Sequence, residues 1–298
     1  MSDKRVQFDF EIEFLNGGGL QGQGFRLDID GDDIDDAVLA EYLIRDLRLL
    51  MVGKAHILNK QIIVEAHKRS GASDSPGPTT GTRFVDLSHT IEDGMVTYKG
   101  LPAPLICDHL SREQSRALYA DGTEFQIGRI TMVSNTGTYI DSPFHRFADG
   151  TDIADLSLSR IAHLEAIVVR IGADDKRAIP REAFAPFDLR GKAVLVETNW
   201  DRHWRTDQYF EGHPYLTAAA AEFLRASQVA LVGIDSYNID DTNDLRRPVH
   251  TALLGAGIPI VEHLTRLDRL PSRDFRFTAA PPKVRGMGTF PVRAYATL

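Results

Sequence analysis

Two periodicities of apolar residues follow one another in the N-terminal part of the chain. In residues 5–14, RVQFDFEIEF, apolar and polar side chains alternate, which is the pattern of a strand with one buried face. The glycine-rich residues 16–24 predict a turn into a second short strand at residues 25–29, so that the two strands form a hairpin. An acidic turn then precedes apolar residues at helical spacing, which predicts a helix. The helical positions are Ile34, Val38, Leu43, Leu47 and Leu50.

One or two further strands are predicted at residues 54–67, and the periodic pattern then ends. Residues 69–82, RSGASDSPGPTTGT, consist mainly of Ser, Gly, Pro and Thr, a composition typical of linkers. We therefore expect a small α+β domain at residues 1–68, followed by a linker at residues 69–82.

Beyond the linker, residues 83–298 contain short continuous apolar runs separated by loops. The runs EAIVVRI, KAVLVET and VALVGID are apolar at most positions, which indicates strands covered on both faces. A helix is predicted at residues 217–227, where Thr217 is suited to the N-cap. These features predict an α/β fold for the second domain.

Composition narrows the functional classes. Hydrophobic residues make up 43% of the 298 residues, without the apolar run of roughly 18 residues that a membrane span needs. The N-terminus has no apolar core of a secretory signal, so we expect a cytoplasmic protein without a membrane partner. The net charge of -8 argues against nucleic-acid binding, and the single Cys107 excludes a Cys-rich zinc site. A small-molecule partner is expected.

The stretch SNTGTYIDSPFHRF, residues 134–147, gathers several residues with chemical potential. Pro143 lies between Asp141 and His145, and a rigid turn of this kind can direct a carboxylate and an imidazole toward one point. Such a loop is suited to a metal ion. The alternative is a structural turn in which Asp141 accepts hydrogen bonds from backbone N–H groups.

Further ionisable residues stand at the ends of downstream apolar runs. Asp235 follows VALVGI, His250 precedes an apolar helical turn, and Glu262 closes IPIV. Open α/β sheets place their ligands at such strand ends. Taken one at a time, His250 and Glu262 are equally consistent with surface positions that bracket a turn.

Together these motifs bring a family resemblance into view. The chain after the linker resembles the cyclase family of metal-dependent hydrolases, which includes kynurenine formamidase and isatin hydrolase. The family signature is H-x-G-T-H-x-D-x-P-x-H, and NTGTYIDSPFH departs from it at Asn135 and Tyr139. It matches at Gly137, Thr138, Asp141, Pro143 and His145. Further matches are DLSH at 86–89, TNW at 198–200, GID at 233–235, the pair His250 and Glu262, and PVRA at 291–294.

The resemblance implies a swivelling β/β/α fold and attack of water on an amide, lactam or lactone carbonyl. In the family, the two motif histidines and the aspartate bind one metal, and the aspartate bridges to a second metal held by the downstream His and Glu. Carried over, Asp141, His250 and Glu262 are metal ligands and His145 is the acid/base, with Tyr139 beside it on the catalytic side. One divalent metal, zinc or manganese, is the expected cofactor.

The substituted positions leave alternatives open. An Asn carbonyl suits hard cations, and a phenol with a pKa near 10 is a poor zinc ligand. The site therefore keeps one metal on Asp141, His250 and Glu262, has changed to an oxygen-preferring ion such as manganese or magnesium, or binds none. The two functional hypotheses are a metal-dependent hydrolase of C–N bonds and a catalytically silent binding or assembly protein on the same fold.

Several residues complete the set of candidates for metal or substrate binding. Arg146 either binds a substrate carboxylate or forms a structural salt bridge. Aromatic side chains either line a pocket or pack in the core: Phe144, Trp200 and Trp204. Asn135 and Asp235 are further candidates. The first domain is assigned to docking or homo-oligomer formation, partly because its long alternating strand exposes an edge.

Overall fold

A computed structural model divides the chain into two compact units, residues 1–79 and 80–298, which are described one at a time. The structure describes residues 4–15, 17–29, 31–47, 49, 52–64, 82–172 and 177–298. All of the expected linker except Thr82 lies outside the described residues.

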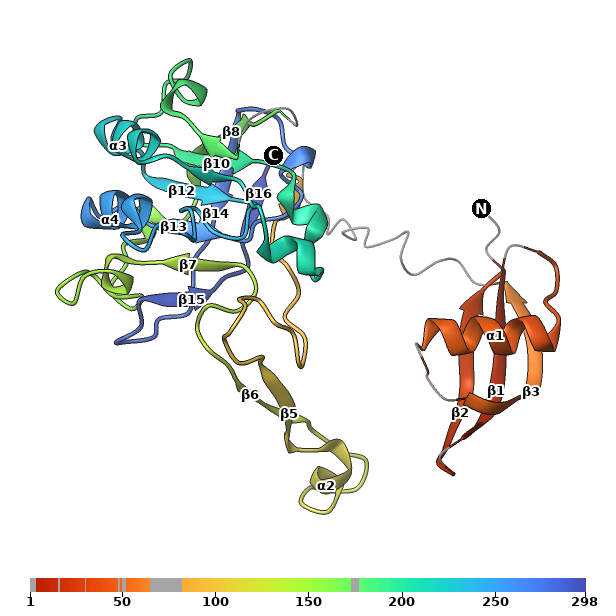
Figure 1. Cartoon of the computed structure of the whole chain (residues 1–298). Helices are drawn as coiled ribbons and strands as arrows, with labels where there is room; N and C mark the ends of the chain where they lie inside the picture. The colour runs from red at the N-terminus through yellow and green to blue at the C-terminus, as the bar shows by residue number, and fades with distance from the viewer. Residues whose placement is uncertain are drawn as a thin grey trace. The chain divides into compact units, whose positions relative to one another are not determined.

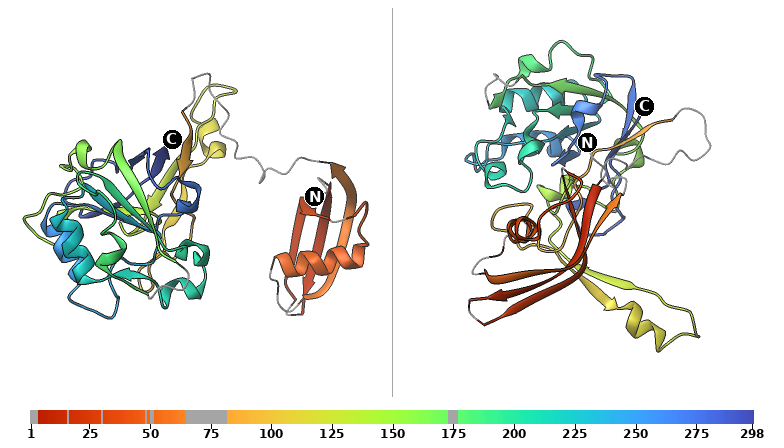
Figure 2. Two further views of the ribbon diagram at one scale, coloured as in Figure 1. Left: turned by 90° about the horizontal axis from the view of Figure 1, so that it is seen from above. Right: turned by 90° about the vertical axis from the view of Figure 1, so that its right-hand side faces the viewer.

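The N-terminal unit contains a three-stranded antiparallel sheet covered by one helix (Figures 1 and 2). Its elements are β1 (Lys4–Phe14), β2 (Gly19–Asp28), α1 (Asp36–Asp46) and β3 (Val52–Val64). The alternating apolar residues of β1 are buried together with Leu39 and Leu43 of α1. Asp35 is the N-cap, since its side chain accepts a hydrogen bond from Ala37 N at 2.9 Å. The predicted strand, hairpin and helix are confirmed.

Three details of this unit differ from the sequence-based expectation. The second strand begins at Gly19, because the glycine-rich segment pairs with β1 over much of its length. Val38 is 55% exposed, and the helix buries Leu39 instead. β1 is the central strand of the order β2-β1-β3, so both of its edges are paired and the edge argument for self-association is wrong.

The C-terminal unit is built on a nine-stranded mixed sheet (Figure 1). The order is β15-β7-β13-β12-β10-β8-β14-β16-β4. The strands are β4 (Phe84–Asp86), β7 (Tyr139–Asp141), β8 (Leu164–Arg170), β10 (Ala193–Glu197), β12 (Leu231–Ile234), β13 (Ile260–Glu262), β14 (Phe275–Thr278), β15 (Thr289–Pro291) and β16 (Tyr295–Thr297). The central strands β8, β10, β12 and β13 are parallel, and the outer pairings are antiparallel.

Both faces of the central strands are covered. Ile167 and Val169 of β8 pack in one core cluster, which includes residues of α3 (Ala218–Ala226) and α4 (Pro248–Gly255). Ala166 and Val168 pack in a second cluster. The continuous apolar runs are therefore buried strands, as predicted. Thr217 caps α3 by accepting a hydrogen bond from Ala220 N at 3.1 Å, which confirms the predicted N-cap.

A two-stranded hairpin projects from this unit (Figure 1). It consists of β5 (Leu105–Leu110) and β6 (Ile127–Thr131), with α2 (Arg112–Arg116) at its tip. Its exposed apolar residues include Leu105, Leu118, Tyr119, Phe125, Ile127 and Ile130. A second small sheet pairs β9 (Ala178–Ile179) with β11 (Tyr215–Leu216). Short 3₁₀ helices span Pro143–His145, Leu158–Arg160, Arg181–Ala183, Trp200–His203, Asp207–Phe210 and Leu267–Arg269. No helix in the described ranges is long and apolar enough to cross a membrane.

Candidate metal centre

Strand pairing brings the two distant motifs together. β7 lies between β13 and β15 and is antiparallel to both. This register places Tyr139 opposite Glu262, and Asp141 opposite Thr289. Residues separated by 123 positions in the chain are therefore neighbours in the sheet.

The imidazole of His250 is held from behind by a carboxylate. His250 lies in the first turn of α4, and the buried Asp240 accepts hydrogen bonds from Val249 N at 2.7 Å and His250 N at 3.0 Å. The same carboxylate lies 2.7 Å from Nδ1 of His250. Since Nδ1–H donates to Asp240, loss of the proton on Nε2 would leave a lone pair there for a ligand. Nε2 lies 3.6 Å from Asp141 Oδ2 and 3.9 Å from Glu262 Oε1.

Asp141 is buried, and one of its two oxygens has no hydrogen-bond partner in the described structure. Oδ1 accepts a hydrogen bond from Thr289 Oγ1 at 2.5 Å, whereas Oδ2 is the unpartnered atom. Thr289 Oγ1 also lies 2.9 Å from Nδ1 of His145. Asp141, His145 and His250 form a group whose candidate ligand atoms all lie within 4.8 Å of one another. A buried carboxylate oxygen without a donor, beside two imidazoles, fits a cation.

Glu262 and Tyr139 form the other side of the site. Glu262 accepts hydrogen bonds from Ile239 N at 2.6 Å and from the Tyr139 hydroxyl at 2.7 Å. The hydroxyl oxygen of Tyr139 lies 3.3 Å from Nε2 of His263, and Nδ1 of His263 lies 2.7 Å from the Tyr209 hydroxyl. Because Tyr139 donates to Glu262, its oxygen accepts from His263, which in turn accepts from Tyr209. Tyr209, His263 and Tyr139 thus form a chain of hydrogen bonds in which each donor points toward Glu262.

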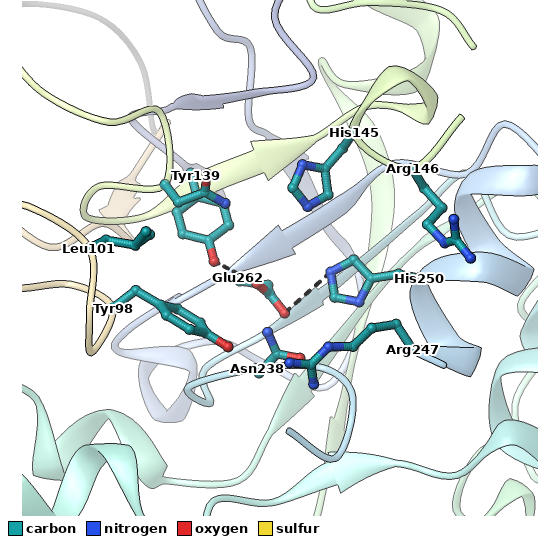
Figure 3. A pocket seen from close by; sticks show the side chains of 10 residues that line it. Tyr98, Leu101, Tyr139, His145, Arg146, Asn238, Arg247, His250 and Glu262 are labelled. Atoms are coloured by element: carbon teal, nitrogen blue, oxygen red, sulfur yellow. Dashed lines mark hydrogen bonds and ion pairs between the residues drawn. The ribbon is translucent and has the colours of Figure 1, made fainter. Parts of the chain in front are cut away.

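A cavity of about 310 Å³ is bordered by Tyr139, His145, His250 and Glu262 among others. Figure 3 shows Tyr139 and His250 on opposite sides of Glu262, each joined to it by a dashed line. The lining residues expected from the sequence are Asn135, Tyr139, His145, Arg146, His250 and Glu262. Those that the sequence reasoning missed are Tyr98, Leu101, Asn238 and Arg247.

Comparison with known proteins agrees with this architecture. The model of the family named Cyclase matches residues 85–241. The chain belongs to the cyclase family. It is 27% identical over 215 residues to a kynurenine formamidase of Bacillus cereus, across 72% of this chain and 96% of the relative.

Solved structures show the same fold. Isatin hydrolase A from Labrenzia aggregata superposes with a TM-score of 0.63 at 21% identity, covering 73% of this chain and 94% of that chain. A protein of Bacillus stearothermophilus, described as a predicted metal-dependent hydrolase, gives a TM-score of 0.58 at 25% identity, covering 73% and 98%. The mixed α/β fold of the larger unit is therefore that of cyclase-family structures.

The electrostatics of this cyclase-family site favour a cation. Burial alone would lower the pKa of His250, but Asp141, Asp240 and Glu262 outweigh it and raise that pKa to about 10. Burial raises the pKa of Glu262 to about 7, although the charge of His250 acts against the shift. Asp141 and Glu262 thus hold a proton on His250, and a metal ion bound between them would supply the positive charge in its place.

Tyr139 is poorly suited to act as a metal ligand in place of the histidine of the family signature. Burial, followed by the charges of Glu262 and Asp141, raises the pKa of Tyr139 well above its usual value. The side chain is therefore a neutral phenol whose proton is engaged by Glu262. Neutral phenols are weak ligands for first-row metals.

Four of the sequence's candidates do not line the cavity: Phe144, Trp200, Trp204 and Asp235. Trp204 stacks on the ring of His89, with the ring centroids 4.0 Å apart. Asp235 accepts hydrogen bonds from Thr198 N at 2.8 Å and Asn199 N at 2.9 Å, which fixes the loop after β10. Trp200 donates from Nε1 to the carbonyl of Tyr209 at 3.0 Å. Both Asp235 and Trp200 thus have structural contacts, and their contact with metal or substrate stays a prediction.

Proposed function

We propose that this chain hydrolyses an amide, lactam or lactone, with one divalent metal held by Asp141, His250 and Glu262. The observation that carries the proposal is the buried, unpartnered Oδ2 of Asp141, 3.6 Å from Nε2 of His250 at the cavity. Family membership and the kynurenine formamidase and isatin hydrolase relatives support a hydrolase of non-peptide C–N bonds.

Asp141 and His250 are common to every ligand set that the geometry allows, and Glu262 is the third ligand in this proposal. Glu262 is buried, oriented by two hydrogen bonds, and 3.9 Å from His250 Nε2. His145 is 35% exposed and lines the cavity, which suits a group that exchanges protons with substrate and water. A divalent ion bound by these residues would polarise a carbonyl and lower the pKa of water.

The remaining residues orient this machinery. Asp240 fixes the ring of His250, and Thr289 fixes both Oδ1 of Asp141 and Nδ1 of His145. With Nδ1 directed at Thr289, Nε2 of His145 is left to accept a proton from the attacking water. The same nitrogen then returns the proton to the departing amine nitrogen or alkoxide oxygen.

The finer expectations from the sequence remain part of this proposal. They are the swivelling β/β/α arrangement, a zinc or manganese ion, a cytoplasmic location, a separate N-terminal docking domain and a homo-oligomer. The β5–β6 hairpin now supports self-association in place of β1, because a two-stranded ribbon with exposed apolar side chains is marginally stable alone.

A substrate panel tests the function. Full-length protein, loaded with zinc or with manganese, is assayed on formyl-amides, lactams and lactones. We expect hydrolysis of at least one class, its loss on chelation and its recovery when metal is returned. Tight binding without turnover under either metal would instead favour the catalytically silent binding protein, an alternative suggested by the altered positions Asn135 and Tyr139.

A further inference from the structure

The segment that carries His145 is held against β15 by close backbone contact. Ser142 donates hydrogen bonds from N at 2.7 Å and from Oγ at 2.9 Å to the carbonyl of Gly288, the residue before β15. A Cβ atom at position 288 would lie 2.5 Å from both Cα and N of His145, so only glycine permits this approach. The fold therefore sets the distance between His145 and the next residue of the strand, Thr289.

The hydroxyl of the buried Thr289 lies between His145 and Asp141. Oγ1 donates a hydrogen bond to Oδ1 of Asp141 at 2.5 Å and lies 2.9 Å from Nδ1 of His145. A hydroxyl group has one proton, and here that proton is directed at the carboxylate. The contact with His145 is therefore a hydrogen bond in which Nδ1–H donates and Oγ1 accepts.

The direction of this hydrogen bond fixes the tautomer of His145. In a neutral imidazole only one nitrogen carries a proton, so a proton on Nδ1 leaves a lone pair on Nε2. The ring lies at the cavity beside that of His250, with the ring centroids 5.9 Å apart (Figure 3). Oδ1 of Asp141 is 3.9 Å from Nδ1, which is too far to accept this proton directly. The hydroxyl of Thr289 is thus the link between the two groups.

We propose that Thr289 is a positioning residue that holds His145 in the Nδ1–H tautomer and links its ring to Asp141. Asp141 then serves two groups: Oδ2 faces the metal site, and Oδ1 faces the imidazole through the hydroxyl. When Nε2 takes a proton from water, the positive charge of the ring faces this carboxylate, and Thr289 itself gives up no proton. The tautomer does not depend on the proposed function, whereas the benefit to catalysis rests on it.

Nuclear magnetic resonance tests the tautomer without turnover. Full-length protein with isotope-labelled histidine is measured metal-free and zinc-loaded, and the ring nitrogens of His145 are assigned by comparison with His145→Gln. At a pH where this ring is neutral, wild type and Thr289→Ser should show a protonated Nδ1. Thr289→Val keeps the shape of the side chain but has no acceptor, so we expect the proton to move to Nε2. A wild-type ring protonated on Nε2, or a Thr289→Val ring that stays protonated on Nδ1, would overturn the proposal.

The matched control is Thr278→Val. Thr278 lies on β14, which is separated from β7 by β13, β12, β10 and β8, and its hydroxyl accepts a hydrogen bond from His163 N at 3.0 Å. This variant also loses a threonine hydroxyl, yet its His145 resonances should match those of wild type. Thermal unfolding midpoints show whether each variant is folded. If Thr289→Val does not fold, a protonated Nδ1 in both wild type and Thr289→Ser supports the proposal, and a protonated Nε2 in either overturns it.

Turnover tests the benefit to catalysis. On a substrate that wild type hydrolyses, and with metal saturating each variant, Thr289→Val should lose at least about tenfold in kcat with little change in KM, because an imidazole protonated on Nε2 cannot accept the proton. Thr289→Ser and Thr278→Val should stay near wild type. An unchanged kcat in Thr289→Val would show that the hydroxyl does not position His145 for catalysis. If wild type hydrolyses no substrate of the panel, the proposed function fails, while the resonances still decide the tautomer.

Discussion

The two halves of the candidate metal centre differ in what their side chains can offer. On one half, Asp240 fixes His250 and Thr289 fixes Asp141, so that a nitrogen and an unpartnered oxygen lie 3.6 Å apart. On the other half, the hydroxyl of Tyr139 is engaged by Glu262. One half therefore presents free donor atoms, and the other presents a closed hydrogen-bond chain.

This difference shows how a site can lose ligands without losing its organisation. A histidine at position 139 would supply a lone pair to a metal, whereas Tyr139 supplies a proton to Glu262. In the proposed site, the substitution would replace a metal ligand with a group that orients Glu262, the proposed ligand of the remaining metal. His263 and Tyr209 extend this support, because each donates toward Glu262 along the same chain.

The largest expected effects come from removing the proposed metal ligands, one from each half. Purified protein should contain at most one tightly bound metal per chain, and His250→Ala or Glu262→Ala should lose it, because each removes a donor that no neighbour replaces.

His145→Ala should keep the metal but lose at least about two orders of magnitude in turnover, the scale of a general acid/base. Elemental analysis and assays on the same preparations measure both quantities.

The control for these variants is His109→Ala, an exposed histidine in β5. It should retain both the metal and activity. Loss of the metal from His145→Ala, with retention in Glu262→Ala, would move His145 into the ligand set. Two tightly held metals in wild type would remove the contrast between the halves.

A smaller effect is expected from restoring the family's histidines. The double variant Asn135→His and Tyr139→His recreates two imidazoles beside Asp141, so we expect the metal content to rise from one to two per chain. Each single variant should stay at one, since one imidazole with a shared carboxylate gives too few strong donors. A double variant that is folded and still binds one metal would show that the surrounding structure, not the side chains at positions 135 and 139, prevents binding of a second metal.

The sequence predicted those features that depend on local patterns. The continuous apolar runs predicted the buried strands β8, β10 and β12, and the signature loop predicted four of the ten residues that line the cavity. The sequence analysis missed Thr289. Its contact with Asp141 arises from the pairing of β7 with β15, which no local pattern encodes. Asp240 left a weak signal, an acidic residue in the loop before a helix that carries a histidine in its first turn.

The smallest effects are expected from removing the hydroxyl group of Tyr139, which links the two halves of the site. Tyr139→Phe removes the donor to Glu262 and the acceptor for His263 while keeping the ring that fills the buried space. Two buried polar groups then lack a partner, which should cost about 1–3 kcal/mol in the free energy of unfolding. Losing a group that orients a metal ligand should also weaken metal affinity about 10- to 100-fold. Denaturant unfolding and competition with a chelator measure the two effects.

Tyr209→Phe separates stability from metal support. It removes only the far donor of the chain, so it should lower the free energy of unfolding yet leave metal affinity close to that of wild type, because Glu262 keeps its bond from Tyr139. If Tyr139→Phe held the metal as tightly as wild type, Tyr139 would be a packing residue. Glu262 would then not need the hydrogen bond from Tyr139 to bind the metal. Equal losses of metal affinity in both variants would instead show that the hydrogen-bond chain acts as one unit.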